Sequence, residues 1–177
     1  MLEKYHVNEL LSLELRNDST YVYVNNREVS ICQHIAVNMS IEQIEFIDEI
    51  NSVDELSELY GRTERAGNLY IITPEEEFFV HCSNFQAWAE QGYNTKLLHS
   101  NISFPLLKRL VEAGDLIAKR VFKEEIVKRY ISGSEKVQSY LSTEGYLDLL
   151  TNIERELIFK EKKKLEKLKN NLNEIKF

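Results

Sequence analysis

The chain has 177 residues, a net charge of −7 at pH 7, and 43% hydrophobic against 29% charged residues, the composition of an ordinary globular protein. Its six glycines and two prolines are too few for an all-β protein built on many tight turns. No apolar run approaches the roughly 20 residues that cross a bilayer. No basic segment followed by an apolar one opens the chain, so we expect a cytoplasmic protein without membrane attachment.

Residues 8–36 are predicted to be rich in β-structure. Runs at residues 10–16, 20–24 and 28–33 alternate apolar with polar residues, or are rich in β-branched and aromatic ones. Asn25 and Asn26 connect the second run to the third, and asparagine tolerates the positive φ of a type I′ turn. We therefore expect a three-stranded antiparallel meander, which needs a covering layer because a small sheet is not stable alone.

Residues 40–150 are predicted to form a helical body. Ser40 and Ser52, each followed three residues later by Gln or Glu, indicate two capped helices. The residues from Thr73 to Glu76 give another helix start, with proline at the first helical position, and this helix runs to Gly92. Apolar residues occupy more than half of its circumference, so we expect it to be buried on most sides at the centre of the fold.

The later helices of this body are predicted to follow one another through short turns. Phe104 and Pro105 open a helix that stops at Gly114, and Gly133 and Gly145 stop the next two. The helix that begins at residue 116 carries apolar residues on two faces, as inner helices of stacked arrays do. The predicted fold class is α+β: a single domain of residues 1–150, in which the meander packs on a mainly helical, HEAT-like or bundle body.

Residues 151–177 are predicted to form one long, charged C-terminal helix. Apolar residues occupy heptad positions along it, but two clean heptads are too few for a coiled coil. A helix this rich in lysine is marginal unless it docks or pairs. We therefore expect it to bind a protein partner or a second copy of the chain, as a homodimer, through Lys160, Lys163, Lys164, Leu165, Leu168 and Leu172.

Seven segments between residues 72 and 147 carry a resemblance to a known family. They are Ile72–Phe78, His81–Trp88, Leu97–Asn101, Phe104–Arg109, Gly114–Asp115, Ala118–Ile126 and Glu144–Leu147. Over roughly residues 10–150 the chain resembles an uncharacterised archaeal domain that commonly stands ahead of leucine-rich repeats. That family offers no activity to carry over. A charged helix stands here where the repeats follow, so the resemblance implies a domain that folds by itself.

Cysteine and histidine supply the residue types suited to catalysis or metal binding: Cys32, His34, His81, Cys82 and His99. Adjacent His81 and Cys82 point about 100° apart on a helix, and no CxxC pair exists, so we expect no metal and no cofactor. Cys82 with His99 could still act as nucleophile and base, which makes a hydrolase-like or metal-binding enzyme the alternative function. Cys82 is otherwise a core residue, as free cysteines often are.

A second group mixes polar and aromatic residue types. His81, Asn84 and Trp88 follow helical spacing, and His99 and Asn101 lie in the next segment. Buried polar groups must find partners, so these residues could form a polar network that holds the helix in place. A pocket for a small ligand or a peptide is the functional alternative.

Charge is distributed unevenly along the chain. Residues 1–102 carry 17 Asp and Glu against 6 Lys and Arg, whereas residues 103–177 carry 12 against 16. Such asymmetry steers partners of opposite charge or favours head-to-tail self-association. Weak nucleic-acid binding through the lysine-rich helix is a second alternative, although the pI of about 5.2 and the interspersed glutamates argue against it. We therefore predict a non-enzymatic protein-interaction module, an adaptor or scaffold.

Overall fold

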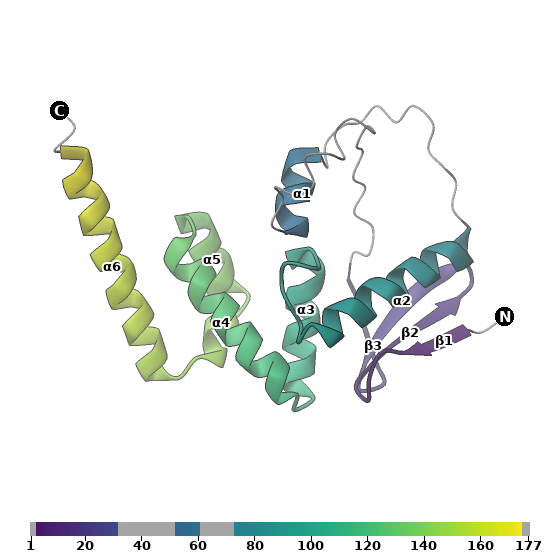
Figure 1. Ribbon diagram of the computed structural model, residues 1–177. Coiled ribbons are helices and arrows are strands. Elements are labelled where there is room, and N and C mark those ends of the chain that lie inside the picture. The colour runs from purple at the N-terminus through teal and green to yellow at the C-terminus, as the bar shows by residue number, and fades with distance from the viewer. Residues whose placement is uncertain (1–2, 32–51, 61–72, 175–177) are drawn as a thin grey trace. The chain divides into compact units, whose positions relative to one another are not determined.

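The computed structural model of the chain describes residues 3–31, 52–60 and 73–174 (Figure 1). Cys32, His34 and the helix predicted after Ser40 lie outside these residues. The chain divides into two compact units, Met1–Val121 and Phe122–Phe177. The α+β class is confirmed, with β-strands in the first unit and helices in both.

The first unit begins with an antiparallel sheet of four strands in the order β1-β2-β3-β4. These strands are β1 (Glu3–His6), β2 (Leu11–Arg16), β3 (Ser19–Val24) and β4 (Arg27–Val29). The meander is therefore confirmed, but the prediction of three strands is wrong. β1 escaped detection because most of its side chains are exposed, which leaves no apolar-polar alternation to recognise. It pairs with β2 from Glu3 opposite Leu15 to His6 opposite Ser12.

Two-residue turns set the register of the sheet. Asn17 and Asp18 have φ values of 51° and 58°, and Asn25 and Asn26 have values of 48° and 60°. Two consecutive left-handed residues give the type I′ turn, whose twist matches that of antiparallel strands. This register places Leu11, Leu13, Leu15, Val22, Val24 and Val29 in the core.

Helix α2 (Pro74–Glu90) covers this sheet, lying across β2 and β3 (Figure 1). Its predicted cap is confirmed, since the Glu76 N–H donates to the Thr73 hydroxyl and the Thr73 N–H donates to the Glu76 carboxylate. Its buried residues are Phe78, Cys82, Phe85 and Trp88, which follow one helical stripe. The prediction that α2 is buried on most sides is wrong, because Phe79 and Val80 are 60% and 54% exposed.

Helices α1 (Val53–Tyr60), α3 (Ser100–Glu112) and the start of α4 (Leu116–Ser132) complete the first unit. α3 packs against β3 and β4, and begins four residues earlier than predicted because the imidazole of His99 caps it, accepting from the Asn101 N–H. A polar chain ties the unit together. The buried Tyr93 hydroxyl donates to Asp115 (2.6 Å) and accepts from the Asn8 amide (3.1 Å).

The second unit contains the rest of α4, then α5 (Glu135–Thr143), the 3₁₀ helix η2 (Tyr146–Leu149) and α6 (Asn152–Glu174). The predicted break at Gly145 is confirmed by its φ of 71°. The core of this unit consists of Phe122, Ile126, Leu141, Tyr146, Leu147, Leu150 and Ile158. Among the described helices, none combines the length and hydropathy needed to cross a bilayer.

Candidate functional site

Helix α6 is fixed at its N-terminus by a capping box and an ion pair. The Glu154 N–H donates to the Thr151 hydroxyl, and the Thr151 N–H donates to the Glu154 carboxylate. The Lys123 ammonium reaches the same carboxylate at 2.8 and 3.0 Å. The bonds from Lys123 and Thr151 lower the pKa of Glu154 to about 2, so this carboxylate is charged at all ordinary pH values.

The next two turns of α6 attach its inner side to α4. Ile158 is buried, and the Phe159 ring lies 5.4 Å from that of Tyr130. The Lys162 ammonium donates to the backbone carbonyls of Ile131 (3.1 Å) and Gly133 (2.8 Å). Carbonyls at a helix C-terminus lack intrahelical partners, so a lysine is well placed there. These contacts fix the rotation of α6 about its own axis.

Because one side of α6 is packed, its other side faces solvent. Ile153 is 73% exposed, Leu157 59% and Leu168 50%. These residues and four lysines cover an arc of about 140° at the helical rotation of 100° per residue. We call this surface the open face of α6: Ile153, Leu157, Lys160, Lys163, Lys164, Lys167 and Leu168.

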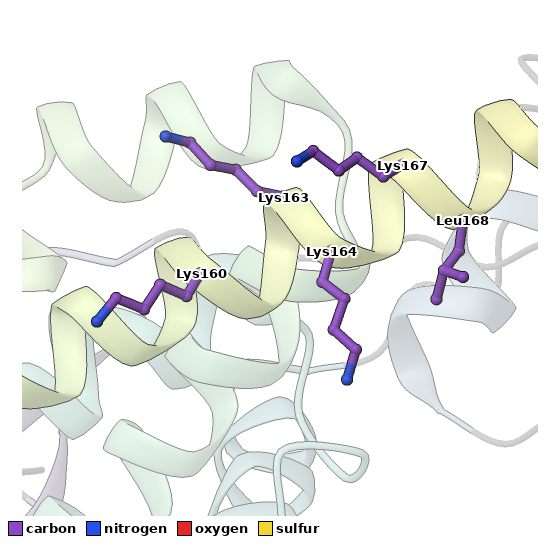
Figure 2. Close-up of a pocket in the computed structure, with 5 residues that line it drawn as sticks. All are labelled: Lys160, Lys163, Lys164, Lys167 and Leu168. Atoms are coloured by element: carbon purple, nitrogen blue, oxygen red, sulfur yellow. The ribbon is translucent and has the colours of Figure 1, made fainter.

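The basic half of the open face contains a shallow hollow of about 360 Å³, lined by the four lysines and Leu168 (Figure 2). Lys163 and Lys167 extend to one side of the helix axis in this view, and Lys164 and Leu168 extend to the other. None of the four lysines forms an ion pair with another described residue. Four ammonium groups spread along two turns suit an extended anionic surface better than a single small anion.

Part of the open face of α6 was predicted from the sequence. Lys160, Lys163, Lys164 and Leu168 lie on the open face, whereas Leu165 is half-buried on the packed side. The side chain of Leu172 lies outside the described residues. Ile153, Leu157 and Lys167 were missed, because the heptad pattern selected the stripe of Ile158 and Leu165 that packs against the chain's own helices. The i, i+4 pair of Ile153 and Leu157, in line with the lysines, was the available signal.

The catalytic alternative receives no support from the geometry around Cys82. Burial raises the pKa of this thiol to about 11, with the Glu3 charge as a smaller cause, so it stays protonated and unreactive at neutral pH. Among the described residues, Cys82 and His99 share no hydrogen bond. No three His, Cys, Asp or Glu side chains of the described part of the chain gather as metal ligands would.

The mixed polar and aromatic residues occupy four different local settings. His99 caps α3 and bonds the Asn101 N–H, while its Nε2 lies 3.4 Å from the Asp54 carboxylate. Asp54 also accepts from the Ser100 N–H at 2.7 Å, which attaches α1 to the start of α3. His81 lies against Glu77 in the same helix, Asn84 is exposed, and Trp88 is in the core. His99 and Asn101 thus meet in a helix cap whose bonds join α3 to α1, whereas the predicted network was to hold α2.

Comparisons with family models, curated proteins and solved structures found no match for this chain. The resemblance to an archaeal repeat-associated domain therefore stays a prediction. Within the described part of the chain, the open face of α6 is the candidate functional site.

Proposed function

We propose that the chain is a non-enzymatic protein-interaction module, an adaptor or scaffold, whose docking surface is the open face of α6. The observation that carries the proposal is the exposure of Ile153 and Leu157 in line with lysines that have no described ion-pair partner. Removing these apolar side chains from water supplies affinity. The lysines supply orientation and select an acidic partner.

The order of side chains along the face favours a protein partner over nucleic acid. The exposed apolar residues Ile153 and Leu157 stand at one end, and the lysines follow. A phosphate backbone rewards positive charge but gains little from contact with aliphatic side chains. An amphipathic protein helix can satisfy both halves at once.

The same order of side chains along α6 argues against binding to a membrane surface. A helix that lies in the interface needs an apolar stripe along its length with basic residues at the flanks. On α6, Lys160 and Lys164 instead occupy the same stripe as Ile153 and Leu157. Seating this stripe among acyl chains would bury ammonium groups.

Photo-crosslinking from the open face tests the proposal. A benzophenone amino acid replaces Leu157 in the full chain, and crosslinked products from the source cells are identified by mass spectrometry. We expect a defined protein, joined through an acidic segment. The double substitution Lys160→Glu/Lys164→Glu should remove this product, because it reverses the charge beside the probe.

A matched control changes the same charge elsewhere. Lys119 and Lys136 are exposed and lie outside α6, so Lys119→Glu/Lys136→Glu should leave the crosslink intact. Products that contain only nucleic acid or lipid would contradict the proposal. So would a protein crosslink that the reversal in α6 leaves unchanged.

A further inference from the structure

The outward side of α2 is the opposite of the open face of α6 in charge and similar to it in form. Its exposed residues include Phe79 and Val80, and glutamates stand before and after them. α2 contains no lysine or arginine. We call this surface the acidic face of α2: Glu75, Glu76, Phe79, Val80, Ser83, Ala87 and Glu90. It covers an arc of about 140°, as the open face does.

We infer that the occupant of the open face of α6 is the acidic face of α2 in a second copy of this chain. The inference rests on the proposed function, because it names the partner of the same surface. Two observations motivate it. Both faces are exposed in the structure, and they combine apolar groups with charges of opposite sign.

An antiparallel arrangement matches the apolar parts of the two faces. Leu157 can lie against Phe79 in this arrangement, and Ile153, one turn before Leu157, then falls beside Ser83, one turn after Phe79. Ser83 is small, so the two helices can approach closely there.

The same register matches the charges. Lys160 and Lys164 follow Leu157 along α6, and Glu76 and Glu75 precede Phe79 along α2. Because the helices run in opposite directions, Lys160 arrives beside Glu76, and Lys164 lies about one helical turn from Glu75. Each exposed pair contributes little alone, so the charges orient the contact and burial of the apolar groups stabilises it.

Every copy carries both halves of this contact. The surfaces differ, so the interface is heterologous, and one copy can use its α6 and its α2 at the same time. Such contacts generate closed rings or open chains of subunits. We therefore expect the mass in solution to rise with concentration above the 20.8 kDa of one chain.

Sedimentation analysis of the nuclease-treated full chain tests the inference, over about 1 to 300 μM protein. Association should weaken at least tenfold between about 50 and 500 mM salt, because part of it is electrostatic. Lys160→Glu/Lys164→Glu should also weaken it at least tenfold. Glu75→Lys/Glu76→Gln should act equally, and it keeps the helix cap because glutamine can still accept from the Thr73 N–H.

The decisive sample combines the two sets of substitutions in one chain. The lysine introduced by Glu75→Lys then faces the carboxylates introduced on α6, so a pair of opposite charges is restored and self-association should return to within about threefold of the original. The Lys119→Glu/Lys136→Glu control, exposed and outside α6, should associate like the unmodified chain. Circular dichroism of each variant checks that its helices are retained.

The outcomes separate the inference from the proposed function. A chain that stays monomeric throughout, or a combined variant that fails to recover, contradicts the inference. Association that responds to the substitutions in α6 but not to those in α2 also contradicts it. The crosslink from Leu157 then decides the proposed function by itself, through a partner that is not this chain.

Discussion

Replacing Tyr93 by phenylalanine probes the polar chain that joins distant parts of the first unit. The Tyr93 hydroxyl bridges Asn8, in the turn between β1 and β2, and Asp115, in the turn between α3 and α4. Both neighbours also hold backbone groups, since Asn8 accepts from the Leu11 N–H and Asp115 from the Ala118 N–H. The substitution keeps the ring, which packs 4.8 Å from Trp88, and removes only the hydroxyl.

The expected loss of stability follows from the two hydrogen bonds of that hydroxyl. The bond to the Asp115 carboxylate involves a charged group, for which the usual contribution is about 1.5 to 3 kcal/mol. The Asn8 amide also loses its acceptor in a part-buried position. We therefore expect Tyr93→Phe to reduce the free energy of unfolding by about 2 to 3 kcal/mol, and Tm by roughly 5 to 10 °C.

Denaturant unfolding followed by tryptophan fluorescence measures this loss. Trp88 is the single tryptophan of the chain and is fully buried beside Tyr93. Tyr130→Phe is the matched control, because the Tyr130 ring packs on Phe159 while its hydroxyl bonds no other described residue. That change should alter stability by less than about 0.5 kcal/mol by circular dichroism. An equally small effect of Tyr93→Phe would refute the structural role assigned to the hydroxyl.

Three further predictions concern single sites. Glu154→Gln should lower the free energy of unfolding at neutral pH, because it removes the ion pair with Lys123. The folded pKa of Glu154 is about 2, below its ordinary value of 4.5, so the difference in stability between the variant and the unmodified chain should shrink as the pH falls from 4.5 toward 2. In a Cys32→Ser chain at mildly alkaline pH, a thiol reagent should modify Cys82 at least about 100-fold more slowly in the folded protein than in the unfolded one, because a pKa near 11 leaves little thiolate. Fast labelling of the folded protein would support the catalytic alternative. Gly133→Ala should cost about 1 to 3 kcal/mol in thermal unfolding, since the added Cβ would meet a backbone carbonyl of α4 and a side chain of α5; an unchanged Tm would contradict this close approach.

Local signals allowed much of the fold to be predicted. The cap at Thr73 and the turn at Asn25 and Asn26 are confirmed, because each depends on the geometry of a few adjacent residues. The stops at Gly114 and Gly145 are confirmed by φ values of 93° and 71°, which glycine adopts more easily than a residue with a Cβ. Element boundaries of this kind need no knowledge of the distant chain.

Burial was harder to predict, because it depends on what the rest of the chain places nearby. Phe79 on α2 and Ile117 on α4 have apolar side chains that the helical pattern assigned to a core, yet both are exposed. Conversely, Leu165 was assigned to a partner interface and is half-buried on the packed side of α6. Which stripe of α6 faces outward depends on Lys162 reaching the end of α4, and the sequence of α6 alone offers only the pair of Ile153 and Leu157 as a signal.

The short turns of the β-meander have a consequence during synthesis on the ribosome. Neighbouring strands pair through local contacts, so the sheet can form as soon as residue 29 has emerged. Its covering helix ends at Glu90, about 60 residues later. At a translation rate of roughly 5 to 20 residues per second, the apolar face of the sheet stays uncovered by α2 for several seconds. A nascent chain at this stage should be a substrate for holding chaperones.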